Sequence, residues 1–140
     1  MENKTIEYIL TKPFQVGKGG DFIDAEIIKI TEPVYRDIHK ANILQQQFLI
    51  TLNKNKNETK ANNDVGIDDI KGKDLYMALA MGGANLELCI NTLKELLKTS
   101  AFVNGDIKIT ETILTQISIQ DFNLILGEYL KSFLLGDLMN

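Results

Sequence analysis

Few residues in this 140-residue chain have side chains suited to enzyme chemistry, and they are not grouped. The chain has one histidine, His39, and one cysteine, Cys89. A zinc site needs several Cys or His ligands, and these two residues are too few to supply them. Counting alone leaves a Ser-His-Asp triad open. However, His39 falls in mid-helix among surface residues, and Cys89 falls on the apolar side of a helix, where a thiol is normally buried and inert.

Two other patterns are partial matches to ligand-binding loops. Residues 17–20 (GKGG) resemble a phosphate loop, but the upstream glycine and the Ser or Thr after the lysine are missing. Asn53, Asn55, Asn57 and Asp64 have the spacing of calcium ligands, but the turn glycine is absent and the leading ligands are neutral. We therefore expect no catalytic residues, no cofactor and no metal site, and the chain is not expected to be an enzyme.

The charge and hydropathy of the chain argue against nucleic-acid and membrane partners. The net charge is −4, and the fifteen basic residues are scattered, whereas nucleic-acid affinity depends on clustered Lys and Arg. No apolar run approaches the roughly 18 residues of a membrane span, and no hydrophobic segment follows the first Met. A single cysteine cannot form an internal disulfide. These features predict a cytoplasmic protein that works by binding other proteins.

The element pattern predicts one α+β domain over residues 1–140, mainly α, with an N-terminal β-hairpin followed by four or five helices. In the predicted hairpin, Ile6, Tyr8 and Leu10 alternate with other residues in a first strand that ends at Pro13, and a glycine-rich turn follows. The expected parts are a hairpin over 1–31, a helix over 32–52, a mobile loop over 53–66 and a helical part over 67–140.

Capping signals divide the helical part. Gly82 follows one apolar pattern, Asn85 precedes the next, and Ser118 with Asp121 forms a Ser-x-x-Asp capping box. Residues 53–64 have no large apolar side chain, which predicts the mobile loop. The expected helices cover residues 32–52, 67–81, 86–99, 110–116 and 119–135.

The last predicted helix has an aromatic stripe, Phe122, Tyr129 and Phe133. Such a stripe most often packs in a core. The alternative is a helix face that docks into a partner groove or onto a second copy of the chain. We predict that these three residues contribute to partner or self contacts, because a helix at the C-terminal end is easily left half-covered.

Two parts of the chain together resemble phage tail assembly chaperones, small proteins of long-tailed phages and prophages. Residues 8–14 (YILTKPF) resemble the opening strand of that family with its Lys-Pro ending. Residues 30–38 (ITEPVYRDI) resemble its second strand running into an acidic-proline helix start. Residues 113–121 (ILTQISIQD), with the following helix that ends in Phe133-Leu134, resemble its closing helix. The Asn- and Lys-rich segment 53–64 departs from the family pattern.

The resemblance implies a function without catalysis. Such chaperones coat the tape measure protein, help recruit subunits of the major tail protein to it, and are absent from the finished particle. The chain would then act in the host cytoplasm, with the tape measure protein and the major tail protein as partners. The alternative is a structural tail or head–tail completion protein that stays in the phage particle.

Overall fold

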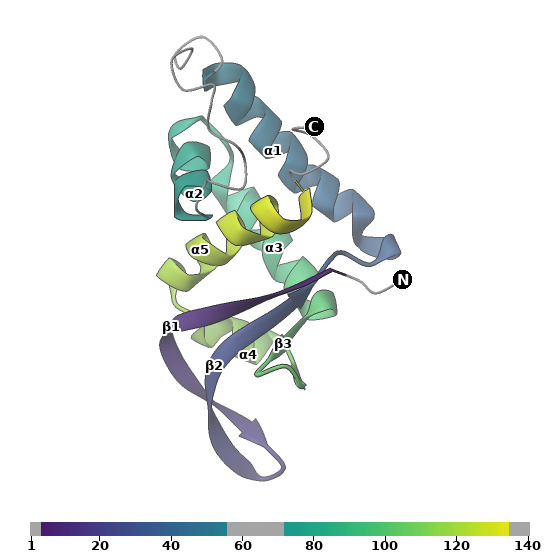
Figure 1. Cartoon of the computed structure of the whole chain (residues 1–140), viewed down its shortest axis with the longest axis vertical. Helices are drawn as coiled ribbons and strands as arrows, with labels where there is room; N and C mark the ends of the chain where they lie inside the picture. The colour runs from purple at the N-terminus through teal and green to yellow at the C-terminus, as the bar shows by residue number, and fades with distance from the viewer. Residues whose placement is uncertain (1–3, 56–71, 135–140) are drawn as a thin grey trace.

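The computed structural model describes residues 4–55 and 72–134 (Figure 1). Four antiparallel strands form one sheet in the order β1-β2-β3-β4. Their bounds are Thr5–Lys18, Asp21–Thr31, Ala101–Val103 and Ile107–Lys108. The predicted α+β class and the N-terminal hairpin are confirmed. The predicted architecture was too narrow, because the segment after α3 adds two short strands to the hairpin.

Each expected helical segment contains a helix, but the helix expected from residue 32 begins only at Ile38, and residues 67–71 lie outside the described residues. The helix bounds are Ile38–Asn55 for α1, Gly72–Met81 for α2, Leu86–Ser100 for α3, Glu111–Gln116 for α4 and Ile119–Tyr129 for α5. A 3-10 turn, Tyr35–Asp37, precedes α1, and a π-helical turn, Leu130–Leu134, continues α5. Since α1 runs to Asn55, the prediction of a loop from residue 53 was wrong at its start. Residues 56–66 of that loop lie outside the described residues.

The predicted caps form as expected. Asn85 accepts a hydrogen bond from the Leu88 N–H at 3.0 Å, and the Ser118 hydroxyl accepts one from the Asp121 N–H at 3.1 Å. These bonds satisfy N–H groups that have no partner within their own helix. Local sequence therefore fixes where α3 and α5 begin.

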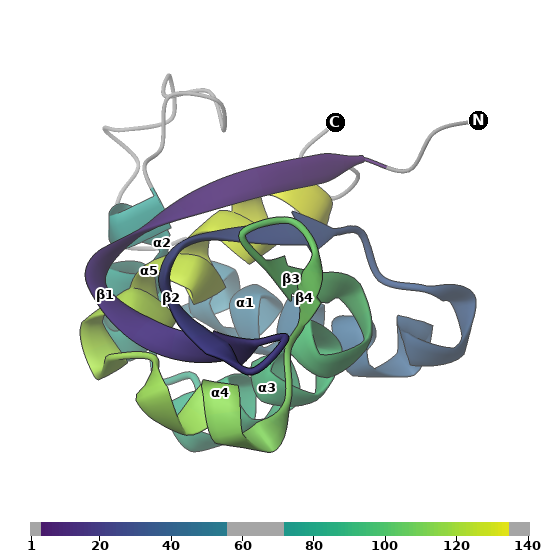
Figure 2. The ribbon, with the colours of Figure 1, turned by 90° about the horizontal axis from the view of Figure 1, so that it is seen from below.

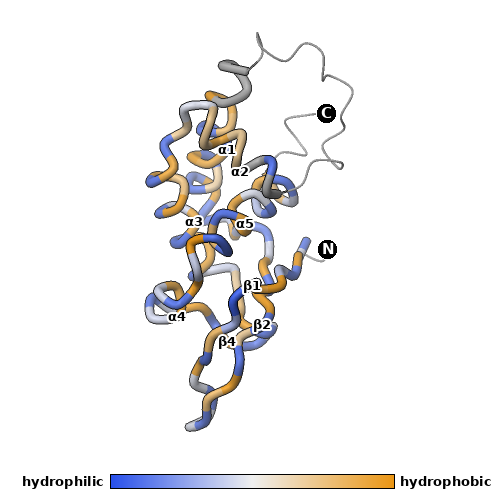
Figure 3. Tube along the Cα trace, turned by 90° about the vertical axis from the view of Figure 1, so that its left-hand side faces the viewer, coloured by the Kyte–Doolittle hydropathy of each residue, from blue (hydrophilic) through white to orange (hydrophobic). Residues whose placement is uncertain are grey.

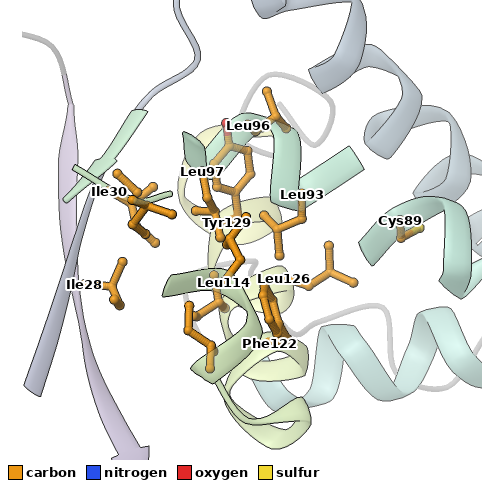
Figure 4. Packing of buried hydrophobic residues seen from close by; sticks show 14 of the residues in the cluster. Ile28, Ile30, Cys89, Leu93, Leu96, Leu97, Leu114, Phe122, Leu126 and Tyr129 are labelled. Carbon is orange, nitrogen blue, oxygen red and sulfur yellow. The ribbon is translucent and has the colours of Figure 1, made fainter. Parts of the chain in front are cut away.

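The core lies between the curved sheet and the helices. Figure 2 shows the hairpin bending around one side of the helical part. Ile28 and Ile30 of β2 face Leu96 and Leu97 of α3 across this core, with Tyr129 of α5 among them (Figure 4). Each of the five side chains is fully buried. Burial of such side chains supplies most of the driving force for folding.

Strand β1 does not end at Pro13, so that prediction was wrong. The strand pairs Ile9 with Ile27 and then Phe14 with Ala25, which leaves four residues of β1 opposite one residue of β2. Pro13 lies in this bulge, where its missing N–H costs no ladder hydrogen bond. On one side of this offset Ile28 and Ile30 of β2 are buried, and on the other side Ala25 is buried. The inward-facing positions of β2 therefore change from even to odd residue numbers at the bulge.

The carboxylate of Asp121 holds the bulge of β1. Its Oδ1 accepts from the Tyr8 hydroxyl at 2.7 Å, from the Thr11 N–H at 3.0 Å and from the Thr11 hydroxyl at 2.8 Å. Its Oδ2 accepts from the Lys12 N–H at 3.2 Å and from the Ser118 hydroxyl at 3.1 Å. Asp121 is fully buried. The first turn of α5 is therefore tied to a strand that lies more than a hundred residues earlier.

Asn104 holds the other strand of the hairpin at the same level. Its Oδ1 accepts from the N–H groups of Glu26 and Ile27 at 3.0 and 3.3 Å, and its Nδ2 donates to the Asp24 carbonyl at 2.9 Å. The Asn104 backbone has a φ of 53°, a left-handed conformation that asparagine tolerates better than most residues. Side chains thus satisfy the backbone groups that the bulge removes from the ladder.

The donors around Asp121 decide its ionisation. Burial of the carboxyl raises its pKa, but the hydrogen bonds from the Thr11 N–H, the Tyr8 and Thr11 hydroxyls and the Lys12 N–H outweigh this effect, and the net pKa is lowered. All of these groups donate hydrogen bonds to the carboxyl group. Only its ionised form can accept all of them, because a protonated carboxyl is itself a donor. The folded protein therefore stabilises the charged form of Asp121.

The variant Asp121→Asn should lower the free energy of unfolding by about 2–4 kcal/mol, because an amide leaves at least one of the partly buried donors without an acceptor. Urea unfolding followed by circular dichroism measures this. The control Asp106→Asn removes an exposed ion pair with Lys18 and should cost less than about 1 kcal/mol. Equal losses in the two variants would show that Asp121 has no special role.

Acid should destabilise the wild type more steeply than Asp121→Asn. The lowered pKa means that Asp121 stabilises the fold above about pH 3.9, the value of an unfolded aspartate, and that this contribution is lost as pH falls through the folded-state pKa. The other acids titrate in both proteins. Urea unfolding at several pH values between neutrality and strong acid gives the two curves, and parallel curves would contradict the assignment.

Candidate protein-binding site

Helices α2 and α5 lie side by side (Figure 1) and leave an apolar groove at the surface. The cavity is about 380 Å³. A second cavity of about 240 Å³ adjoins it, and the two share Ile119 and Asn123 in their walls. The first is lined by Tyr76, Met77, Ile119, Gln120, Asn123 and Leu124. We call the two cavities together the Ile119 groove.

The rotation of α5 places Ile119 at the surface. Ser118 caps the helix and Asp121 turns toward β1. At about 100° per residue, Ile119 and Asn123 then lie on the side of the helix away from Asp121. Ile119 is 79% exposed although it is a large apolar residue. The interaction that anchors α5 therefore also presents this side chain to solvent.

Tyr76 and Met77 form the α2 wall of the groove, and Met81 lies one turn further along the same helix. Met77 is 46% exposed and Met81 is 78% exposed, and the spacing of four residues puts them on one helix face. Methionine side chains are unbranched and polarisable, so they adapt to partners of different shape. A surface of this kind suits binding to apolar segments that vary in sequence.

The Ile119 groove has a single charge. Among the described residues that line its two cavities, Lys94 is the only charged one. The Lys94 Nζ lies 5.4 Å from the centroid of the Phe122 ring, which places the ammonium over a ring face that attracts cations. The groove is therefore apolar with one positive edge, on a chain whose net charge is −4.

The structure buries most of the predicted partner-binding stripe. Phe122 is 5% exposed and Tyr129 is fully buried (Figure 4). Phe133 is half-buried, with its ring centroid 5.0 Å from that of Tyr129. The expectation of a half-covered C-terminal helix was wrong, because α5 packs against β1, α2 and α3. Core packing, the alternative interpretation, describes Phe122 and Tyr129. Of the three residues, only Phe122 borders the Ile119 groove.

Tyr129 has an unusual hydroxyl. It is buried and makes no hydrogen bond to the described residues. The nearby Ser100 hydroxyl donates instead to the Leu96 carbonyl at 2.6 Å. Burial raises the pKa of Tyr129. The nearby Ser100 hydroxyl lowers this pKa in part, and the negative charge of Asp37 raises it further. The phenol is therefore neutral at physiological pH, and its hydroxyl contributes little to the fold.

The remaining candidates for chemistry do not come together. His39 is exposed at the second residue of α1, and Cys89 is buried in α3, where burial raises the pKa of its thiol to about 11. No group of three or more His, Cys, Asp or Glu in the described part of the chain could hold a metal ion. Within residues 4–55 and 72–134, no helix is long and apolar enough to cross a membrane. Comparison with protein-family models, curated proteins and solved structures finds no match to this chain.

Replacement of Tyr129 should separate its ring from its hydroxyl. Tyr129→Phe should leave the free energy of unfolding unchanged or raise it by up to about 1 kcal/mol, because an unpaired buried hydroxyl is lost. Tyr129→Ala should lower it by about 3–5 kcal/mol, because a large cavity forms. Urea unfolding measures both variants. A clear loss in Tyr129→Phe would mean that the hydroxyl has a partner.

Proposed function

We propose that this protein is a non-catalytic phage tail assembly chaperone that binds the tape measure protein and helps recruit tail tube subunits in the host cytoplasm. The observation that carries the proposal is the largely apolar Ile119 groove, with the half-exposed Met77 in its wall. The likeness of residues 8–14, 30–38 and 113–121 to that family supports the assignment of the partner.

The groove fits the expected client physically. A tape measure protein exposes long apolar helical faces until the tail tube encloses it, and such faces aggregate unless they are covered. An amphipathic helix can lay side chains three, four and seven residues apart into an apolar groove. Met77 and Ile119 would contact these side chains, and the flexible methionine would adjust to successive segments.

The proposal also assigns a limited role to charge. Lys94 borders one of the two cavities and can meet an acidic side chain beside the apolar face of a client helix. An exposed pair of this kind contributes at most about 1 kcal/mol, so apolar contact must supply most of the affinity. Binding by a small apolar surface is weak and reversible, which a chaperone that leaves the particle requires.

Co-expression with the tape measure protein of the same genome tests the function. The wild type should keep that protein soluble and co-purify with it in several copies. Ile119→Asp should reduce the recovered tape measure protein at least about tenfold, because a charge replaces a central apolar contact. The control Ile9→Asp alters an apolar residue that is 72% exposed on β1 and should have no effect.

Two results would contradict the proposal. If the tape measure protein stays insoluble with the wild type, this chain is not its chaperone. If the chain is found in purified particles in stoichiometric amounts, a structural tail or head–tail completion role replaces the proposed one. Circular dichroism of the Ile119→Asp variant separates loss of binding from loss of fold.

A further inference from the structure

The tip of the β1–β2 hairpin has an aromatic side chain at the edge of a hollow that β4 and α4 also line. Phe22 is 74% exposed. Its cross-strand partner is Gly17, which has no side chain to cover it. The hairpin projects beyond the body of the molecule at this point (Figure 1). An exposed aromatic residue on a protruding hairpin is a shape that can enter a groove.

The charge beside Phe22 is negative. Asp24 lies two residues further on β2, and so on the same face of the strand as Phe22. Asp24 makes no ion pair with the described residues, and the Lys18 ammonium at the turn is paired with Asp106. Asp21, next to Phe22, also makes no ion pair with the described residues, so the tip combines one exposed aromatic side chain with two unpaired carboxylates; Lys108 of β4 lines the hollow beside Phe22.

The Ile119 groove has the opposite features, an apolar cavity and an uncompensated cation. Lys94 makes no ion pair with the described residues, and its ammonium lies over the Phe122 ring. We propose that the hairpin tip of one copy docks into the Ile119 groove of a second copy. Phe22 contacts Ile119 and Met77, and Asp24 faces Lys94. The inference rests on the proposed function in one respect, since it makes the second copy a competitor of the client for the same groove.

The tip of each chain lies away from the α2 wall of its own groove. In two perpendicular views (Figures 1 and 3), the hairpin tip and α2 lie toward opposite ends of the long axis. The two surfaces also differ from each other, so the contact is heterologous and joins copies head to tail. Each copy in such a chain covers the apolar groove of the next one until a client displaces it.

The contact is small compared with stable interfaces. Specific protein–protein interfaces bury roughly 1,200–2,000 Å², and one hairpin tip covers less than that. The association is therefore weak and concentration-dependent. Salt weakens it, because the Asp24–Lys94 attraction is between groups near the surface.

Sedimentation of two complementary variants tests the inference. Phe22→Asp places a charge at the contact surface of the tip, and Ile119→Asp places one in the wall of the groove. Each variant alone should be monomeric at concentrations where the wild type associates. An equimolar mixture should form a one-to-one heterodimer and nothing larger, because one intact tip meets one intact groove. Ile9→Asp, the control, should associate as the wild type does.

A charge exchange tests the pairing of side chains. Asp24→Lys and Lys94→Glu should each weaken association at least about fivefold, and the double variant should restore it at low salt. Monomeric wild type at millimolar concentration would overturn the inference, as would unchanged association in either apolar variant or a mixture that stays monomeric.

The inference and the proposed function fail in different ways. If Phe22→Asp still solubilises the tape measure protein while wild-type self-association is absent, the inference alone is wrong. If self-association follows the pattern above but no client binds, the chaperone function alone is wrong. Circular dichroism of each variant shows that the fold is retained.

Discussion

The structure depends on the buried carboxylate of Asp121. Burial of a charge costs several kcal/mol, but a hydrogen bond to a charged group contributes about 1.5–3 kcal/mol, and Asp121 accepts five. The balance therefore favours the folded, ionised state. Two of the donors are the backbone N–H groups of Thr11 and Lys12 in the β1 bulge, which have no register partner on β2. Asp121 needs these donors to remain ionised in the folded protein, and the N–H groups of the bulge need the carboxylate as an acceptor.

Both proposed contact surfaces follow from this one interaction. On β2, Ile28 and Ile30 face the core, and a regular ladder would turn every even-numbered residue inward, Phe22 included. The bulge changes the phase, so that Ala25 is buried and Phe22 is exposed. On α5, the same carboxylate fixes the rotation of the helix that leaves Ile119 in the groove wall. A change at Asp121 would therefore alter the tip and the groove together.

Sequence patterns predicted the elements whose causes are local. The caps at Asn85 and Ser118 act within four residues, and the helices began where these signals placed them. The capping-box pattern also pointed to Asp121, but only as a residue of a helix start. Its partners Tyr8 and Thr11 are more than a hundred residues away, and no local pattern could reveal them. The end of β1 was wrongly predicted at Pro13 for the same reason. Asp121, which is distant in the sequence, accepts the N–H groups of the bulge, and the bulge lets the strand continue past the proline.

The candidate site was missed because periodicity shows which residues are apolar and does not show which of them are covered. Phe122, Tyr129 and Phe133 were chosen as an aromatic stripe on a helix at the C-terminal end, yet the sheet and α3 bury Phe122 and Tyr129. Ile119 lies seven residues before Leu126 and so near the same side of α5, but it precedes the part of the helix that enters the core. Its neighbour α2 covers it only in part, and that incomplete cover creates the groove. In this chain the core encloses the centre of the amphipathic stripe and leaves Ile119, next to the helix cap, at the surface.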